Sequence, residues 1–146
     1  MLVIVTRIGI PLALVSLLSV SVASTTASQS HTVWDGVYTE EQATRGEQVY
    51  QDECAFCHLD DLLGDAFATP LIDEAFTGRW EGEHLGDLMT VIQVTMPADR
   101  PATLGGEAVA DVIAFLLKMN AYPAGDQELA ANPDDLESII VTSAKP

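Results

Sequence analysis

The sequence predicts an all-α domain built from three main helices. Apolar residues recur at helical spacing in three stretches, and each stretch lies between residues that typically start or stop a helix. After an apolar leader, about 120 of the 146 residues remain, which is enough for one small domain. Residues 91–95 have some strand propensity, but they continue a helical stripe, so no sheet is expected.

The first predicted helix begins after Thr39. The run Thr39-Glu40-Glu41-Gln42 has the form of a capping box, with a hydroxyl at the first position and a glutamine three residues later. This helix is expected to run into Cys54. Its small and apolar residues at helical spacing are Ala43, Gly46, Val49 and Tyr50.

Two more helices are expected downstream. The second should end near Met96, because Pro97 disfavours a helical backbone in the residue before it. The third opens at Gly106-Glu107 and closes at Met119 or Asn120. The apolar stripes are Leu85, Leu88, Met89 and Ile92 in the second helix and Val109, Val112, Ile113 and Leu116 in the third.

The strongest chemical signal is the run Cys54-Ala55-Phe56-Cys57-His58. CxxCH is the spacing at which a chain attaches one haem c covalently. Two thiols three residues apart share a helical face, so each can form a thioether to one vinyl group of the same porphyrin. His58 is then expected to be the proximal iron ligand.

Two other interpretations of the CxxC spacing compete with haem attachment. A structural zinc site needs four ligands, and the chain offers only these two cysteines and three histidines, His31, His58 and His84. A thioredoxin-like redox disulfide follows a strand in a βαβ unit, whereas the flanks here are predicted to be helical. Both patterns are therefore disfavoured.

The sixth iron position is predicted to be filled by Met96. It lies in a Thr95-Met96-Pro97 turn, and the fixed φ of Pro97 turns the chain away after the sulfur. Met89 and Met119 fall on apolar helical stripes, where methionine usually fills gaps in a core. His84 is the alternative ligand, but it stands where an ordinary residue at a helix start is expected.

Residues 1–27 have the layout of a secretory signal peptide. Arg7 precedes an apolar run, and a stretch of small residues follows, with cleavage expected after Ala23 or Ala27. The alternative is an uncleaved membrane anchor over residues 2–22. Export together with CxxCH predicts a location in the bacterial periplasm, with no stable membrane insertion once the leader is removed.

The composition is strongly acidic. Asp and Glu total 22 against 6 Lys and Arg, and the formal net charge is −16. Such a field repels nucleic acid and anionic membranes, so these partners are excluded. It favours partners with a basic docking surface; the alternative is that the charge serves solubility alone.

Taken together, these motifs resemble the class I, or monohaem, c-type cytochromes over residues 38–122. The haem motif stands near the N-terminal end and the methionine lies before a final helix, which is unlike the order in cytochromes c′. The residues that carry the resemblance are Gly46, Tyr50, Cys54-Ala55-Phe56-Cys57-His58, Thr69-Pro70-Leu71, Thr95-Met96-Pro97 and the closing helix over Ala108–Met119.

The resemblance implies a cytochrome c-like fold, with three main helices wrapped around one covalently attached haem. It also implies that the first and last helices cross closely at Gly46 and Tyr50, with Phe115 or Leu116 as the partner on the last helix.

The resemblance further suggests which residues surround the haem. The carbonyl of Pro70 would accept the second ring N–H of His58, and Leu71 would pack on the macrocycle. Trp80 and Arg79 would reach a haem propionate. The alternative for this last pair is a core tryptophan beside a solvated arginine.

The flanks divide the chain into four parts. Residues 1–27 form the leader, residues 28–37 an N-terminal extension, residues 38–122 the cytochrome c domain, and residues 123–146 an acidic C-terminal extension. The two extensions are similar to those of the monohaem cytochromes that accompany periplasmic quinoprotein dehydrogenases.

The expected function is electron transfer rather than enzymatic catalysis. A monomer would exchange single electrons with redox proteins, such as a quinoprotein dehydrogenase or a terminal oxidase. Two alternatives are a haem enzyme or gas sensor with an open distal site, and a haem subunit of a larger quinoprotein dehydrogenase complex.

Overall fold

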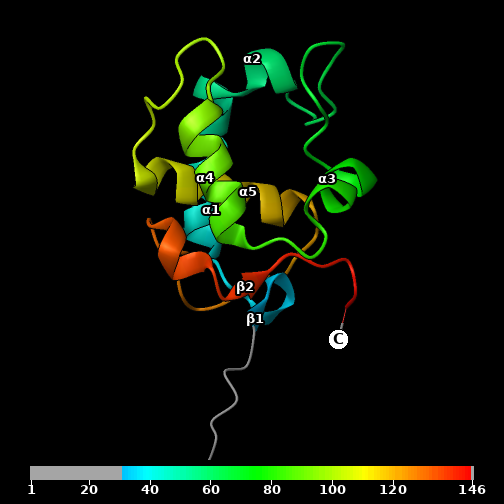
Figure 1. Cartoon of the computed structure of the whole chain (residues 1–146), viewed down its shortest axis with the longest axis vertical. Coiled ribbons are helices and arrows are strands. Elements are labelled where there is room, and N and C mark those ends of the chain that lie inside the picture. The colour runs from blue at the N-terminus through cyan, green and yellow to red at the C-terminus, as the bar shows by residue number, and fades with distance from the viewer. Residues whose placement is uncertain (1–30, 146) are drawn as a thin grey trace, which may run out of the picture.

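Helices make up nearly all of the regular structure in the computed structural model, which describes residues 31–145 (Figure 1). The predicted signal peptide, its cleavage sites and the alternative anchor lie outside these residues. Within residues 31–145, no helix is long and apolar enough to cross a membrane. The elements in chain order are β1 (His31–Thr32), η1 (Val33–Asp35), α1 (Glu40–Glu53), α2 (Ala55–His58), α3 (Asp73–Trp80), α4 (Leu85–Thr95), α5 (Gly106–Met119), η2 (Pro133–Leu136) and β2 (Ile139–Ile140).

The three predicted helices are confirmed as α1, α4 and α5. Thr39 is the N-cap of α1, and its hydroxyl oxygen accepts a hydrogen bond from the Gln42 N–H at 3.1 Å. α4 ends at Thr95, with Met96 as its C-cap residue, and α5 closes at Met119 as expected.

Two shorter helices, α2 and α3, were not predicted. α2 is a single turn that is separate from α1 and carries the last four residues of the CxxCH motif, with Cys54 between the two helices. α3 has two buried residues, Phe76 and Trp80, so its apolar stripe is too short to show a helical period in the sequence. Both residues join the core formed by the longer helices.

The centre of the fold is the crossing of α1 and α5. A Cβ atom on Gly46 would overlap the carbonyl oxygen of Asp111 and lie 3.0 Å from the Cβ of Phe115. The rings of Tyr50 and Phe115 pack beside this point, with centroids 5.2 Å apart. The predicted close crossing is therefore confirmed, and its aromatic partner is Phe115. The backbones approach this closely because the residue on α1 has no side chain.

The C-terminal segment packs onto α1 through polar contacts. The buried amide of Gln42 donates to the carbonyl of Leu129 at 3.1 Å and accepts from the Leu129 N–H at 2.8 Å. Arg45 bonds Asp111 on α5 and Glu128 in the tail, each at 2.9 Å. Gln42 therefore binds the tail instead of completing the predicted capping box, which explains why a polar side chain is tolerated in the core.

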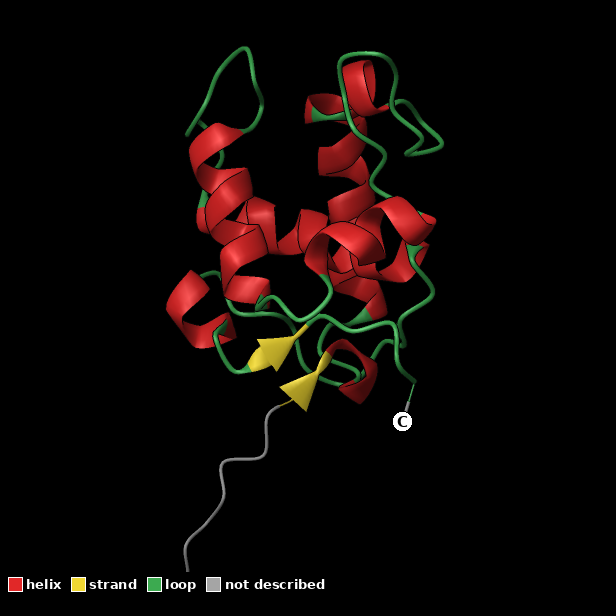
Figure 2. Cartoon of the chain, turned by 45° about the vertical axis from the view of Figure 1, so that its right-hand side comes forward, coloured by secondary structure: helices red, strands yellow, loops and turns green. Residues whose placement is uncertain are grey.

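The expectation of no sheet is wrong in one detail. β1 and β2 form a two-stranded parallel pair, in which His31 is opposite Ile139 and Thr32 is opposite Ile140. Each strand has only two residues, too few for any alternation of apolar and polar residues to be visible. Figures 1 and 2 show this pair at the end of the molecule farthest from α2.

The helix crossing gives a direct stability test. Gly46→Ala should lower the free energy of unfolding by about 1–3 kcal/mol, because the new methyl group collides with the backbone of α5. Gly78→Ala in α3 is the control, since nothing lies within 4 Å of its added Cβ. The control should leave stability unchanged or raise it by up to about 1 kcal/mol. Denaturant unfolding measures both, and equal losses would contradict the close crossing.

Candidate functional site

The CxxCH motif is held on one tight turn directly after α1. Cys54 caps the end of α1, and its N–H donates to the carbonyl of Tyr50 at 2.8 Å. The N–H groups of Cys57 and His58 both donate to the carbonyl of Cys54, at 3.1 and 3.0 Å. This turn places both free thiols and the imidazole within one short segment, with Cys54 half-buried and Cys57 exposed.

The thiol chemistry of Cys54 differs from that of a redox-active disulfide. Burial, with smaller contributions from the nearby Glu53 and Cys57, raises the pKa of Cys54 to about 11. The thiol is therefore protonated at neutral pH, whereas reactive CxxC cysteines have a depressed pKa. In addition, the motif follows a helix and not a strand. Both observations disfavour the thioredoxin-like interpretation.

His58 is buried and oriented by a backbone carbonyl. Its side chain is buried, with 9% of the residue exposed, and its Nδ1 lies 2.9 Å from the carbonyl oxygen of Thr69. With Nδ1–H donating to that carbonyl, the lone pair of the ring is on Nε2, the arrangement typical of a metal-binding histidine.

The predicted acceptor for His58 is corrected by one residue. The Pro70 carbonyl was expected, but the acceptor is the carbonyl of Thr69, which belongs to the peptide bond that joins Thr69 to Pro70. Pro70 fixes the backbone after this carbonyl and has no N–H of its own. Its effect on His58 therefore comes through the preceding peptide unit.

The segment between α2 and α3 brings Thr69 and Pro70 back to His58. The Gly64 N–H donates to the carbonyl of His58 at 3.0 Å, and the Leu71 N–H donates to the carbonyl of Leu62 at 2.8 Å. Leu62 is buried, and Leu71 is half-buried against the core. Packing of Leu71 on a macrocycle stays a prediction.

Met96 lies at the same end of the molecule as the CxxCH motif. Figures 1 and 2 both show the C-terminal end of α4 and the turn α2 at this end. Met96 is partly buried, in extended backbone directly after α4. Of the other described methionines, Met89 is buried in the core and Met119 is at the end of α5. The position of Met96 suits a ligand approaching from a loop.

His84 is at the opposite end of α4. It is the N-cap residue, and its N–H donates to the carboxylate of Asp87 at 3.3 Å. α4 has 11 residues, which corresponds to a length of about 16 Å. His84 is therefore separated from Met96 by the whole helix, a poor position for an iron ligand near α2.

Three further charged or aromatic residues have defined partners. Arg100 forms an ion pair with Glu53, which ties the loop after Met96 to the end of α1, next to the haem motif. The exposed Arg79 stacks over the ring of Trp80, with 4.5 Å from Cζ to the ring centroid, and Trp80 belongs to the core. Contact of Arg79 or Trp80 with a propionate stays a prediction.

The residues at this end fit haem c and do not fit zinc. Two free thiols, an imidazole with Nε2 available and a thioether match the donor set of a His/Met haem. Val91 and Val94 of α4 are exposed apolar side chains of the kind that a macrocycle would cover. Within residues 31–145, no cluster of three or more potential metal ligands from Cys, His, Asp and Glu occurs.

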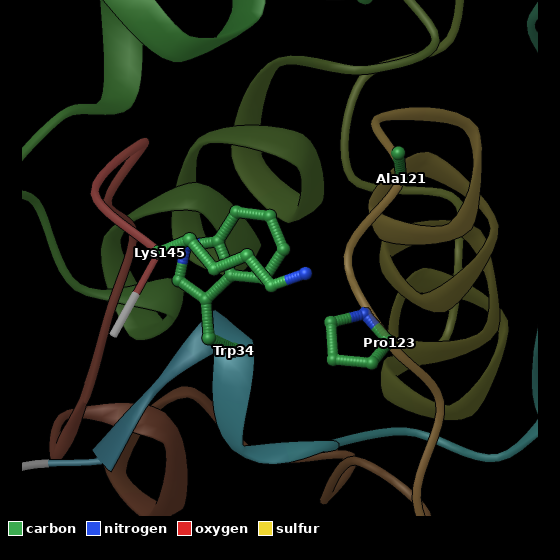
Figure 3. Close-up of a pocket in the computed structure, with 4 residues that line it drawn as sticks. All are labelled: Trp34, Ala121, Pro123 and Lys145. Atoms are coloured by element: carbon green, nitrogen blue, oxygen red, sulfur yellow. The ribbon is translucent and has the colours of Figure 1, made fainter.

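A separate pocket lies beside the C-terminal segment. It measures about 210 Å³ and is lined by Trp34, Ala121, Pro123 and Lys145 (Figure 3). The indole N–H of Trp34 donates to the carbonyl of Thr142 at 2.9 Å, which holds the ring against the tail. None of the predicted site residues lines this pocket.

Fold and site are those of a c-type cytochrome domain. Residues 41–116, just over half of the chain, match the family model described as cytochrome C oxidase, cbb3-type, subunit III. The chain belongs to this family. Membership implies a covalently bound haem c and electron transfer through it, and it confirms the predicted class of protein. The matched segment lies inside the predicted cytochrome c domain over residues 38–122.

The fold is shared with a solved structure. The chain resembles a chain in the crystal structure of the sulfane dehydrogenase SoxCD from Paracoccus pantotrophus, with a TM-score of 0.54 and 18% identity. The match covers 84% of this chain and 68% of the other. At this identity the likeness shows the fold, and it agrees with the all-α prediction. A search of the curated proteins found no match.

Sequence reasoning missed a tight turn in the segment after α2. The Asp65 carboxylate accepts hydrogen bonds from the N–H groups of Phe67, at 2.7 Å, and Ala68, at 3.0 Å. These bonds lower the pKa of Asp65 below its ordinary value of 3.8. The arrangement is an Asx turn, and the Gly64-Asp65 pair is the signal for a turn that was available in the sequence.

This turn should weaken in acid. Because the pKa of Asp65 is lowered in the folded protein, its stabilising effect is present at pH values above 3.8 and is lost as the pH falls through the lower folded value. The Phe67 amide resonance should therefore shift with a midpoint below pH 3.8 in an NMR titration. Asp65→Asn should abolish that shift. A midpoint at or above 3.8 would contradict the hydrogen bonds.

Proposed function

We propose that this protein carries single electrons between redox partners through one haem, held by Cys54 and Cys57 and ligated by His58 and Met96. The observation that carries the proposal is the hydrogen bond between His58 Nδ1 and the Thr69 carbonyl. It leaves Nε2 as a ligand on the same turn as the two free thiols. A turn with only a structural role would have no need of a buried imidazole that is held in one orientation.

The residues have distinct tasks in this proposal. When bound, haem supplies one-electron chemistry at its iron. Cys54 and Cys57 hold it covalently, and His58 is oriented by Thr69 so that its ring does not turn. Met96 supplies a soft, neutral ligand that favours reduced iron. Arg100 and Glu53 keep the loop after Met96 close to the motif.

The placement of polar side chains supports an electron carrier over an enzyme or gas sensor. Catalysis at an open distal site needs a polar group held over the iron. Arg100 is paired with Glu53, Arg79 is stacked on Trp80, and His84 lies at the far end of α4. The two arginines are therefore engaged with other side chains, and His84 is distant from the proposed haem site.

A haem subunit of a larger oxidoreductase is the second candidate. Both comparisons favour it, since one family description names an oxidase subunit and the similar structure comes from a dehydrogenase. The electron transfer would be the same, with the partner held permanently. Gentle isolation from the native cell tests this candidate, which predicts a stable complex with a quinoprotein dehydrogenase or a terminal oxidase.

Spectroscopy tests the proposed ligation. The haem-loaded ferric protein should show the far-red sulfur-to-iron charge-transfer band, and Met96→Ala should lose it and bind carbon monoxide when reduced. Met119→Leu is the matched control, because Met119 is at the end of α5 and should leave the spectrum unchanged. If Met119→Leu loses the band and Met96→Ala keeps it, the iron ligand is Met119 and the proposed assignment to Met96 is wrong. A wild type that binds carbon monoxide readily would favour the sensor.

A periplasmic location is also proposed, based on the leader over residues 1–27. Expression in a bacterium with a haem c maturation system should yield haem-loaded protein in the periplasmic fraction. N-terminal sequencing should then begin at Ser24 or Ser28. Recovery only from membranes, with the leader intact, would identify the anchored form instead.

A further inference from the structure

Two phenylalanines stand almost fully in water at the α2 end of the molecule. Phe56 on α2 is 96% exposed, and Phe67 in the following segment is 98% exposed. The Gly64 N–H bonds the carbonyl of His58, so the turn that carries Phe67 is tied to α2 (Figure 1). Large apolar side chains gathered on a surface typically mark an interaction site.

The haem would not cover Phe56. Successive helical residues are about 100° apart, so Phe56 lies about 130° from the direction midway between Cys54 and Cys57. The thioether bonds need both sulfur atoms on the haem side, which turns Phe56 away from it. The exposure of Phe56 therefore calls for another partner.

Phe67 is presented on a braced turn. Besides the two bonds to the Asp65 carboxylate, the Asp65 N–H donates to the carbonyl of Ala68 at 3.0 Å. Gly64, which precedes Asp65, has a φ of +63°, and a Cβ atom on this residue would collide with the Ala68 carbonyl. The backbone is thus ordered before any partner binds, which lowers the entropy cost of using Phe67 as an anchor.

The charges in the segment between the two phenylalanines indicate what the partner presents. Asp60 and Asp61 are exposed and lie in the segment between Phe56 and Phe67. Exposed apolar side chains in a segment that also carries exposed carboxylates are complementary to a surface that combines apolar groups with lysine or arginine. The exposed Cys57 is on the same turn as Phe56, so a partner seated here would lie close to the attached haem.

We propose that Phe56, Phe67, Asp60 and Asp61, here called the Phe56–Phe67 patch, form the docking surface for a redox protein with an apolar centre and a basic rim. This proposal rests on the proposed electron-carrier function and names the surface through which it acts. The two rings provide contact area, and the carboxylates provide steering that weakens as salt rises.

The test is a rate of electron transfer between haem-loaded proteins. The probe is a lysine-rich mitochondrial cytochrome c, mixed by stopped flow in whichever direction the midpoint potentials allow. At low ionic strength, the double variant Phe56→Ser/Phe67→Ser should lower the second-order rate constant at least tenfold. Met119→Ser, which removes a partly exposed apolar side chain from α5, is the control and should leave it unchanged.

A small reagent separates failure of this proposal from failure of the electron-carrier function. Hexaammineruthenium needs no apolar docking surface, so its rate should be the same in wild type and in the phenylalanine variant. No electron exchange with this reagent in wild type would overturn the carrier function itself. Normal exchange with it, together with an unchanged rate toward the protein probe, would overturn the patch alone.

The charges are tested by a matched pair of variants. Asp60→Asn/Asp61→Asn should lower the rate toward the protein probe severalfold at low salt and flatten its salt dependence. Asp134→Asn/Asp135→Asn changes the net charge equally at η2, which lies toward the opposite end (Figure 1), and should have a smaller effect. Equal effects would show that net charge, and not the patch, steers the partner.

A second copy of the chain is the competing occupant. Sedimentation of the wild type at increasing concentration should show a monomer. A dimer that dissociates in the phenylalanine variant would show that the patch is an interface between two copies of the chain. This result would overturn the assignment to a redox partner.

Discussion

The crossing of α1 and α5 at Gly46 is the contact on which the rest of the structure depends. Without a side chain at this residue, the two backbones approach closely, and Tyr50 and Phe115 close the gap beside them. α1 ends at the haem motif about two turns after Gly46, while α5 leads back to the loop that follows Met96. The crossing therefore sets where the two proposed iron ligands lie relative to each other, although neither belongs to it.

The C-terminal segment shows how an acidic protein of this size keeps its charges from opposing the fold. Arg45 holds Asp111 and Glu128 together, which places two carboxylates from distant parts of the chain around one guanidinium. This pairing lowers the pKa of Glu128. The neutral amide of Gln42 and the hydroxyl of Tyr38 make two further contacts, the former to the Leu129 carbonyl and the latter to the Tyr122 carbonyl at 2.7 Å. Contacts between neutral groups add no charge to the interior.

Much of the fold was predictable from sequence because its main determinants are local. Capping at Thr39, the stop at Pro97 and the apolar stripe of α5 each act within a few residues of the chain. The features that sequence reasoning missed depend on tertiary structure. The pairing of β1 with β2 requires the two ends of the described segment to meet, and the role of Gln42 requires the tail to pack on α1. Likewise, the choice of Thr69 over Pro70 as acceptor depends on which way one peptide unit faces.

The strand pair has a consequence for how the protein can be tethered. β1 and β2 bring both ends of the described chain together at one pole, and the haem motif lies at the other (Figures 1 and 2). Anything joined at either end, such as a surface linker or a fused domain, leaves the opposite pole facing outward. The same geometry makes a C-terminal linker a sensible way to orient the protein on an electrode.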